Sequence, residues 1–422
     1  MPERTSPLRL DRRRFLQATA AVGALPALDA RVASAVPLPA QAATAPSSSD
    51  VGSLFPFIRS QAVKGEFPLS FLQSRFSDVR AWRRDTVAKV LDLLHYAPPP
   101  TPPAAERHEA VDCGDYVRER ITFSTTPDIR VPAYVLVPKT ASAAKPAPGI
   151  VALHDHGGFY LWGKEKLVPV QGEHAIFREF RDRYYGGRAI AEDLARRGYV
   201  VAVIDMFYWG DRRMLLDDDP ADWRERPPAM TPERIQAFNA RASQNEQLVG
   251  RTLYSAGLTW PGVMFWDDIR TVDYLRSRPD VHPERIGCVG LSVGAVRAAH
   301  LAALDDRVKA GVVVCWMTSF PKQLQKHVKN TIGHTKVVPG LHRLLDYPDV
   351  ASLAMPRPML FQSGSRDGLF DLEAIKASFA KLEACYAKAG VPERCRTRLY
   401  DSPHQFNAEM QAEAWEWLGR YV

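Results

Sequence analysis

Cysteine is scarce in this 422-residue sequence, with five residues and no Cys-x-x-Cys pair. A disulfide scaffold needs a denser set of cysteines, and a structural zinc site needs closely paired ligands, so the sequence indicates neither. It also lacks a stripe of basic residues interleaved with aromatic residues, so nucleic acid is not an expected partner. With 46% hydrophobic and 24% charged residues, the composition is typical of a globular protein with a sizeable core.

Long apolar runs are missing too, and the run at residues 18–28 is too short and too rich in alanine for a permanent membrane helix. It follows Arg12-Arg13-Arg14 and precedes Ala33-Ser34-Ala35, which fits a small-x-small cleavage site. We expect residues 1–35 to be a signal peptide that resembles the twin-arginine type, with that export machinery as a partner. The mature protein would then be periplasmic or secreted, without a stable membrane anchor. A basic, disordered N-terminus is the alternative.

The rest of the chain divides by composition and periodicity. Residues 36–52 are rich in alanine, proline and serine, which is typical of a flexible linker. Residues 53–110 are expected to be an N-terminal helical extension, because apolar residues over 69–94 recur at helical spacing. In residues 111–422, short buried runs alternate with helical segments, which predicts one α/β catalytic domain.

A strand, a sharp turn and a helix are predicted around Gly290-Leu-Ser-Val-Gly294. In this setting the pattern Gly-x-Ser-x-Gly is that of a nucleophile elbow, which holds a serine in a strained turn at a strand end. The two glycines let the strand and the helix approach each other. Because the helix starts at the serine, its free N–H groups would point toward a developing oxyanion. Ser292 is therefore the candidate nucleophile, and a glycine-rich turn with an idle serine is the alternative.

Two later strand ends supply a candidate acid and a candidate base. Asp367 and His404 each directly follow a predicted core strand, which completes the order Ser, Asp, His of an α/β-hydrolase triad. His404 would take the proton of Ser292, and Asp367 would hold the imidazole tautomer. Asp371 is the nearest rival acid and Asp205 is a weaker one.

A second glycine-rich turn, His154-Asp-His-Gly-Gly158, follows the buried run 149–153 and resembles the oxyanion loop of lipases and esterases. Glycine lets the backbone turn its N–H groups toward a substrate oxygen, and the partner donor would be the N–H of Val293. The residues expected to bind the oxyanion or the substrate are Val293, His156, Gly157, Gly158, Phe159, Trp209 and Trp260. The alternatives are a metal pair at His154 and His156 or a structural turn with buried histidines. No metal and no other cofactor is expected.

Two long excursions, 206–262 and 316–354, interrupt the alternation and are expected to be cap or pocket insertions. The first is rich in aromatic residues and is expected to form the wall of the substrate pocket. The alternative is a surface decoration, with the pocket at 316–354. Asp211 and Arg212 are expected to form a structural ion pair.

Over residues 69–422 the sequence resembles bacterial α/β-hydrolases of the dienelactone hydrolase and acetyl-xylan-esterase-like group. The resemblance is carried by Leu153-His-Asp-His-Gly-Gly158, Asp205 with Gly210-Asp-Arg212, Trp266-Asp-Asp-Ile-Arg270, Gly290-Leu-Ser-Val-Gly294, Pro356-Arg-Pro358, and Asp367 with His404. It implies an α/β-hydrolase fold with a mostly parallel, eight-stranded sheet flanked by helices, long cap insertions and a serine mechanism. Dienelactone hydrolases proper use a cysteine nucleophile, whereas this chain has Ser292.

These features favour an exported serine hydrolase that cleaves a carboxylic ester through an acyl-enzyme. Its substrate would be a small-molecule or carbohydrate-linked ester. A serine peptidase or amidase resembling the prolyl-oligopeptidase group is the second hypothesis, although residues 36–110 are too few for the propeller domain of that group. A non-catalytic binding protein on the same fold is the third. Cys385 and Cys395 are expected either to form a disulfide in an oxidising compartment or to stay free thiols.

Overall fold

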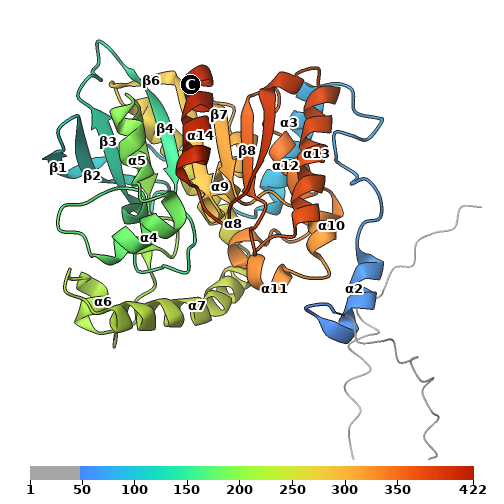
Figure 1. Ribbon diagram of the computed structural model, residues 1–422, viewed down its shortest axis with the longest axis horizontal. Helices are drawn as coiled ribbons and strands as arrows, with labels where there is room; N and C mark the ends of the chain where they lie inside the picture. Colours follow the sequence, from blue (N-terminus) through green and yellow to red (C-terminus); the bar gives the residue numbers. More distant parts are fainter. Residues whose placement is uncertain (1–47) are drawn as a thin grey trace, which may run out of the picture. The chain divides into compact units, whose positions relative to one another are not determined.

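The computed structural model describes residues 48–422 (Figure 1). The predicted signal peptide at 1–35 and most of the predicted linker at 36–52 lie outside the described residues. Within residues 48–422, no helix has the length and apolar character needed to cross a membrane.

A nine-stranded sheet forms the centre of the molecule, in the order β1-β2-β3-β5-β4-β6-β7-β8-β9. Its strands are β1 (Glu106–Asp112), β2 (Tyr116–Ser124), β3 (Arg130–Pro138), β4 (Ala147–Leu153), β5 (Val200–Ile204), β6 (Val281–Leu291), β7 (Val308–Val314), β8 (Met359–Gly364) and β9 (Cys395–Tyr400). The pairs from β1 to β3 and the pair of β3 with β5 are antiparallel, and all other pairs are parallel.

The predicted mostly parallel sheet is confirmed, but the predicted number of eight strands is wrong. The additional strand is β1, which pairs with β2 at the edge of the sheet. None of its residues is buried, so its sequence has no apolar alternation that would reveal a strand. By contrast, all residues of β5 and β8 are buried, as expected for strands covered on both faces.

Helices cover both faces of the sheet (Figure 1). The α-helices are α2 (Phe55–Gln61), α3 (Val79–Leu93), α4 (Ile176–Tyr185), α5 (Ile190–Arg196), α6 (Ala221–Glu225), α7 (Pro232–Ser255), α8 (Trp260–Ser277), α9 (Val293–Leu304), α10 (Phe320–Gln323), α11 (Val328–Thr331), α12 (Tyr347–Ser352), α13 (Leu372–Lys388) and α14 (Ala408–Tyr421). Short 3-10 helices are η1 (Gly52–Leu54), η2 (Lys164–Lys166), η3 (Gly210–Arg212), η4 (His334–Lys336), η5 (Leu341–Arg343) and η6 (Pro392–Arg394). Helices α5 and α14 lie on one face, and α8 and α9 lie on the other.

The N-terminal part is less helical than the sequence predicts. Helix α3 begins only at Val79, because Asp78 caps it by accepting hydrogen bonds from the next N–H groups, those of Arg80 and Ala81. The preceding residues, 69–78, form turns. The segment expected as a helical extension, 53–110, also ends in a strand, because β1 begins at Glu106.

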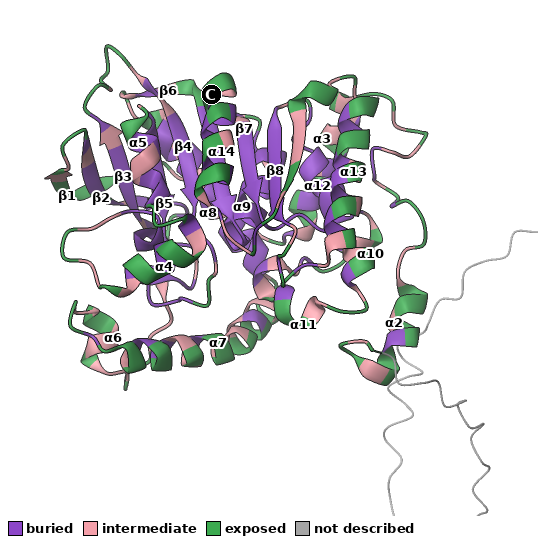
Figure 2. Cartoon of the chain, in the orientation of Figure 1, coloured by how far each residue is buried: buried purple, intermediate pink, exposed green. Residues whose placement is uncertain are grey.

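The two insertions lie beside each other below the sheet in the view of Figure 1. The first contains α6 and α7, and the second contains α10, α11 and η4. They are in direct contact: the Tyr254 hydroxyl of α7 donates to the carbonyl of Val337 at 3.3 Å. A side chain at Gly250 of α7 would collide with the His334 ring, which a Cβ atom would approach to 2.3 Å. Figure 2 shows that α7 is exposed on its outer side. The insertions lie at the carboxyl ends of the parallel strands, where Ser292 follows β6.

Candidate active site

Ser292 stands at the tight turn between β6 and α9. Its backbone angles are φ 58° and ψ −118°, a region that residues with a side chain rarely occupy. The turn depends on two glycines, since a Cβ atom on Gly290 would lie 2.2 Å from the carbonyl oxygen of Gly294, and one on Gly294 would lie 2.0 Å from that of Leu153. The N–H of Ser292 donates to the Val314 carbonyl of β7 at 2.9 Å. The backbone therefore holds the serine in a strained conformation at the end of a central strand.

The structure brings Asp367 and His404 together although they follow different strands, β8 and β9. The Nδ1 atom of His404 lies 2.7 Å from Oδ2 of Asp367, whose side chain is fully buried. The other carboxylate oxygen, Oδ1, accepts a hydrogen bond from the N–H of Leu369 at 3.0 Å. A carboxylate at Nδ1 favours the tautomer with hydrogen on that nitrogen, so Nε2 is left as a proton acceptor.

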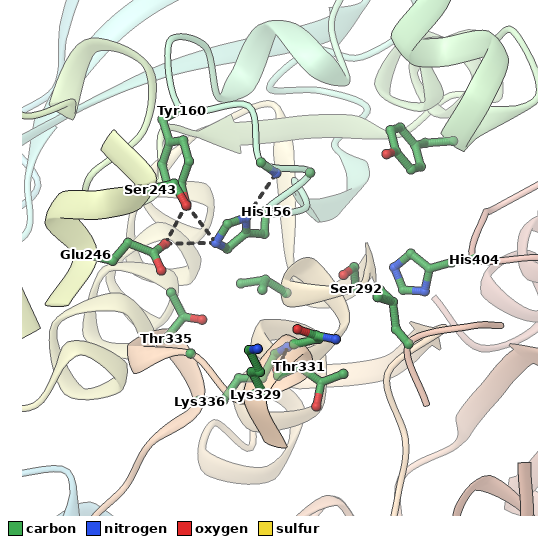
Figure 3. Close-up of a pocket in the computed structure, with 17 residues that line it drawn as sticks. His156, Tyr160, Ser243, Glu246, Ser292, Lys329, Thr331, Thr335, Lys336 and His404 are labelled. Atoms are coloured by element: carbon green, nitrogen blue, oxygen red, sulfur yellow. Dashed lines mark hydrogen bonds and ion pairs between the residues drawn. The ribbon is translucent and has the colours of Figure 1, made fainter. Parts of the chain in front are cut away.

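Ser292 and His404 line one cavity, whose volume is about 360 Å³ (Figure 3). Among the described residues no hydrogen bond joins the Ser292 hydroxyl to the His404 ring. In enzymes without substrate such bonds are often long and tighten only when substrate binds. The two side chains thus share the space in which a substrate would lie.

The two rival acids, Asp371 and Asp205, form hydrogen bonds with other groups. Asp371 is the N-cap of α13, and its Oδ1 accepts the N–H of Ala374 at 2.9 Å. Asp205 is buried, and its carboxylate accepts a hydrogen bond from the Lys164 ammonium at 2.6 Å and another from the N–H of Asp211 at 2.9 Å. Neither carboxylate hydrogen-bonds to His404, so Asp367 is the acid that the geometry pairs with the histidine.

The turn His156-Gly157-Gly158 borders the same cavity, as does Val293. Gly157 and Gly158 have φ values of 59° and 65°, which favour glycine, and a Cβ atom on Gly157 would lie 2.5 Å from Oδ2 of Asp155. The N–H of Gly158 donates to Nδ1 of His156 at 3.0 Å. The N–H groups of Gly157 and of Val293, the first residue of α9, are therefore the candidate donors to an oxyanion.

Comparison with known proteins supports the reading of this fold. Residues 183–337 match the model of the dienelactone hydrolase family. These residues are similar to that family, and the chain as a whole has the α/β-hydrolase fold. This confirms the resemblance predicted from the sequence. The matched residues include the elbow serine, Ser292, but end before Asp367 and His404.

The individual proteins that this chain is similar to are distant. A provisionally named hydrolase, YtaP of Bacillus subtilis (strain 168), is 27% identical over 344 residues, which cover 82% of this chain and 100% of that protein. A provisionally assigned acetyl xylan esterase of Bacteroides fragilis NCTC 9343 has a TM-score of 0.61 and 18% identity, covering 83% of this chain and 82% of the other. A glucuronoyl esterase from Solibacter usitatus has a TM-score of 0.56 and 16% identity, covering 85% and 98%.

A glutamate from the first insertion fixes the glycine turn. Oε1 of Glu246, on α7, lies 2.8 Å from Nε2 of His156 and accepts the Tyr160 hydroxyl at 2.9 Å (Figure 3). Because Nδ1 of His156 accepts the Gly158 N–H, Nε2 carries the hydrogen and donates it to the glutamate. Burial raises the pKa of Glu246, but the hydrogen bonds from His156 and Tyr160 outweigh burial and lower it overall. The sequence analysis missed this residue, because one glutamate in an amphipathic helix carries no signal.

The three aromatic residues predicted to bind substrate do not line the cavity. Phe159 is buried and stacks on Phe180, with ring centroids 5.2 Å apart. Trp209 is fully buried; it stacks on Tyr160 and donates its Nε1–H to the carbonyl of His156 at 3.3 Å. Trp260 is also fully buried and packs edge-on against Trp209. The tryptophans support the wall from behind instead of forming its surface.

The second insertion supplies much of the wall that was expected from the first. The first insertion contributes only Ser243 and Glu246. The second contributes Lys329, Asn330, Thr331, Gly333, Thr335 and Lys336. Burial lowers the pKa of Lys336 to about 8, although the negative charges of Glu246 and Asp367 oppose that change. The cavity is therefore polar on several sides, a property that the aromatic content of the first insertion did not suggest.

The ion pair predicted between Asp211 and Arg212 does not form. Asp211 accepts the buried ammonium of Lys164 at 2.7 Å, and Arg212 donates to Asp267 of α8 at 2.7 Å. Lys164 also donates to Asp205. These contacts fasten the start of the first insertion to the end of β5 and to α8.

The histidines of the glycine turn have no ring nitrogen left for a metal pair. Nδ1 of His154 lies 2.9 Å from the carbonyl of Asp155, and Nε2 accepts the N–H of Met206 at 3.1 Å. Burial lowers the pKa of His154 far below its ordinary value, which keeps the ring neutral. The contacts of His156 with Gly158 and Glu246 occupy its nitrogens in the same way.

The cysteines are free thiols, so the alternative of a bond between Cys385 and Cys395 is not realised. Cys315 lies near the candidate acid and base, with ligand atoms of Cys315, Asp367 and His404 within 4.8 Å of one another. In the described part of the chain this is the one group of three that could hold a metal ion. However, burial raises the pKa of Cys315 to about 12, so the thiol keeps its proton. The Asp367 carboxylate and the His404 imidazole are already hydrogen-bonded to each other.

Proposed function

We propose that the protein is an exported serine hydrolase that cleaves a carboxylic ester through an acyl-enzyme on Ser292. The observation that supports this most strongly is the 2.7 Å contact between His404 and Asp367 at the same cavity as a serine with strained backbone. A strained serine, an oriented imidazole and a glycine turn with positive φ values are together costly to maintain without a chemical use.

The roles follow from the positions of the atoms. Oγ of Ser292 attacks the ester carbonyl carbon while Nε2 of His404 takes its proton, and Asp367 stabilises the resulting imidazolium. The N–H groups of Gly157 and Val293 stabilise the negative charge on the carbonyl oxygen. When the tetrahedral intermediate collapses, the C–O bond to the alcohol breaks and His404 returns the proton to the leaving oxygen. Water, activated by the same histidine, then hydrolyses the acyl-enzyme and restores Ser292.

A polar ester is the substrate class that this cavity fits. Hydroxyl, amide and ammonium groups line it, and its volume of about 360 Å³ is at the small end of ligand sites. The neighbours named as acetyl xylan and glucuronoyl esterases add support for a carbohydrate-linked ester. For location, the paired arginines at 12–13 before a short apolar run support export to the periplasm or beyond.

A substrate screen tests the proposal. Purified protein would be assayed on aryl acetates, acetylated sugars, methyl glucuronate and matched 4-nitroanilides. We expect hydrolysis of esters, little of anilides, and a loss of roughly 10³-fold or more in kcat for Ser292→Ala or His404→Ala. The double variant should be little worse than either single one, because the residues act as a unit. Faster cleavage of anilides than of esters would instead indicate an amidase.

A further inference from the structure

Two lysines of the second insertion line the cavity that Ser292 and His404 share. Lys329 belongs to α11 and Lys336 to η4, so the insertion brings both to one wall. Figure 3 shows this wall on the side away from Tyr160 and His156. Because both lysines line the same cavity as the reacting serine, their ammonium groups are candidates for contact with substrate.

Neither lysine forms a salt bridge with a described residue. The ammonium of Lys336 donates to the carbonyl of Thr331 and lies 5.7 Å from the ring centroid of Phe370. These contacts leave further N–H donors of Lys336 available, since an ammonium has three. Lys329 is exposed, and its backbone N–H donates to Asp50 at 3.0 Å.

The carboxylates near this cavity are already engaged with other groups. Glu246 accepts hydrogen bonds from His156 and Tyr160, and Asp367 is hydrogen-bonded to His404. An ammonium that is partly withdrawn from water without a paired anion is costly, whereas an anion bound beside it recovers that cost. The wall therefore holds positive charge that no residue of 48–422 pairs in a salt bridge.

We propose that the ester substrate carries an anionic group, a carboxylate in the first place, which Lys329 and Lys336 bind while the ester carbonyl lies at Ser292. The inference rests on the proposed ester hydrolysis and adds the charge of the substrate to it. The hydroxyl groups of Thr331 and Thr335 lie on the same wall and are suited to polar atoms next to the anion.

The test compares esters that differ in charge but little in size. On the alcohol side, 4-acetoxybenzoate and 4-acetoxybenzenesulfonate are compared with neutral 4-acetoxybenzamide. On the acyl side, mono-4-nitrophenyl adipate is compared with 4-nitrophenyl hexanoate. The readout is the ratio of kcat/KM for the anionic ester to that for its neutral partner, measured for wild type, Lys329→Gln, Lys336→Gln and the double variant. Intrinsic differences in ester reactivity cancel when these ratios are compared between variants.

We expect each single substitution to lower the ratio for at least one pair by roughly three- to tenfold, and the double substitution to lower it further. Lys322→Gln, an exposed lysine of the same insertion outside the cavity, should leave the ratio unchanged. A drop for the benzoate alone assigns a carboxylate, and a drop for benzoate and sulfonate assigns an anion in general.

Two outcomes would overturn the inference. If wild type hydrolyses the neutral esters and no ratio responds to either lysine, the anionic substrate is wrong while the proposed ester hydrolysis stands. If wild type hydrolyses none of the five esters, both proposals fail. Thermal melting of each variant checks that a changed ratio does not reflect partial unfolding.

Discussion

Glu246→Ala removes the carboxylate that joins α7 to the glycine turn. The carboxylate accepts hydrogen bonds from His156 at 2.8 Å and from Tyr160 at 2.9 Å, and its side chain is 15% exposed. A hydrogen bond to a charged group contributes about 1.5–3 kcal/mol, but water can enter the space that alanine leaves. We therefore expect the free energy of unfolding to fall by roughly 2–3 kcal/mol and the Tm to fall by a few degrees.

The effect of Glu246→Ala on catalysis should be separable from its effect on stability. Without Glu246 the His156 ring can change tautomer or turn, which releases the Gly158 N–H from Nδ1 and loosens the neighbouring Gly157. Loss of a whole oxyanion donor costs roughly 10²–10³ in kcat. Here the donor stays but its position is no longer fixed, so kcat should fall by roughly 10–100-fold with little change in KM.

The assay for Glu246→Ala uses kcat and KM on 4-nitrophenyl acetate, together with the inhibition constant of phenylboronic acid, whose serine adduct resembles the tetrahedral intermediate. The inhibitor should weaken in parallel with kcat. Glu246→Gln keeps an oxygen acceptor for His156 and should restore kcat to within a few-fold, and Gln247→Ala, an exposed neighbour, is the control. If Glu246→Ala lowers Tm while kcat and inhibitor affinity stay within twofold of wild type, the carboxylate serves only the fold.

Three further predictions follow from other residues. Asp367→Asn should lower kcat by roughly 10³-fold or more while the protein stays folded, because the amide favours the wrong imidazole tautomer; a silent variant would mean that another acid orients the histidine. Changing both Arg12 and Arg13 to Lys should leave unprocessed precursor in the cytoplasm, and normal export would exclude the twin-arginine reading. The preference for an anionic ester over its neutral partner should be full below pH 7 and fade as pH rises through about 8, since Lys336 is charged below its pKa and neutral above it. The nearby Glu246 keeps its charge over this range because its pKa is lowered. A constant ratio of kcat/KM for the two esters from pH 7 to pH 10 would contradict this role for Lys336.

The buried strands and the elbow could be predicted because their signals are local. Strands β5 and β8 are buried throughout and β4, β6 and β7 over most of their length, so their buried parts are largely apolar in the sequence. The turn at Ser292 needs glycines on both sides, and the contacts at Gly290 and Gly294 show why. Strand β1 could not be found in this way, because none of its residues is buried and it is held by pairing with β2.

The residues that line the cavity were harder to predict, because aromatic residues in a sequence can be either buried in the core or exposed in a binding site. Trp209 and Trp260 are buried behind the wall, and burial and binding give the same composition in the sequence. The residues that do line the cavity include Glu246, Lys329 and Lys336, charged side chains that are usually solvent-facing on a helix or loop. The two insertions, which contact each other, bring these residues to the cavity that Ser292 lines.

The most direct test of the account is covalent labelling of Ser292. A fluorophosphonate forms a stable bond to a serine that an adjacent base activates, and mass spectrometry of the peptides identifies the residue that carries the adduct. We expect one adduct per chain, located on Ser292, in parallel with complete loss of esterase activity. Labelling should be absent from Ser292→Ala and strongly slowed in His404→Ala. An adduct on another residue, or ester hydrolysis that persists in Ser292→Ala, would contradict the serine mechanism.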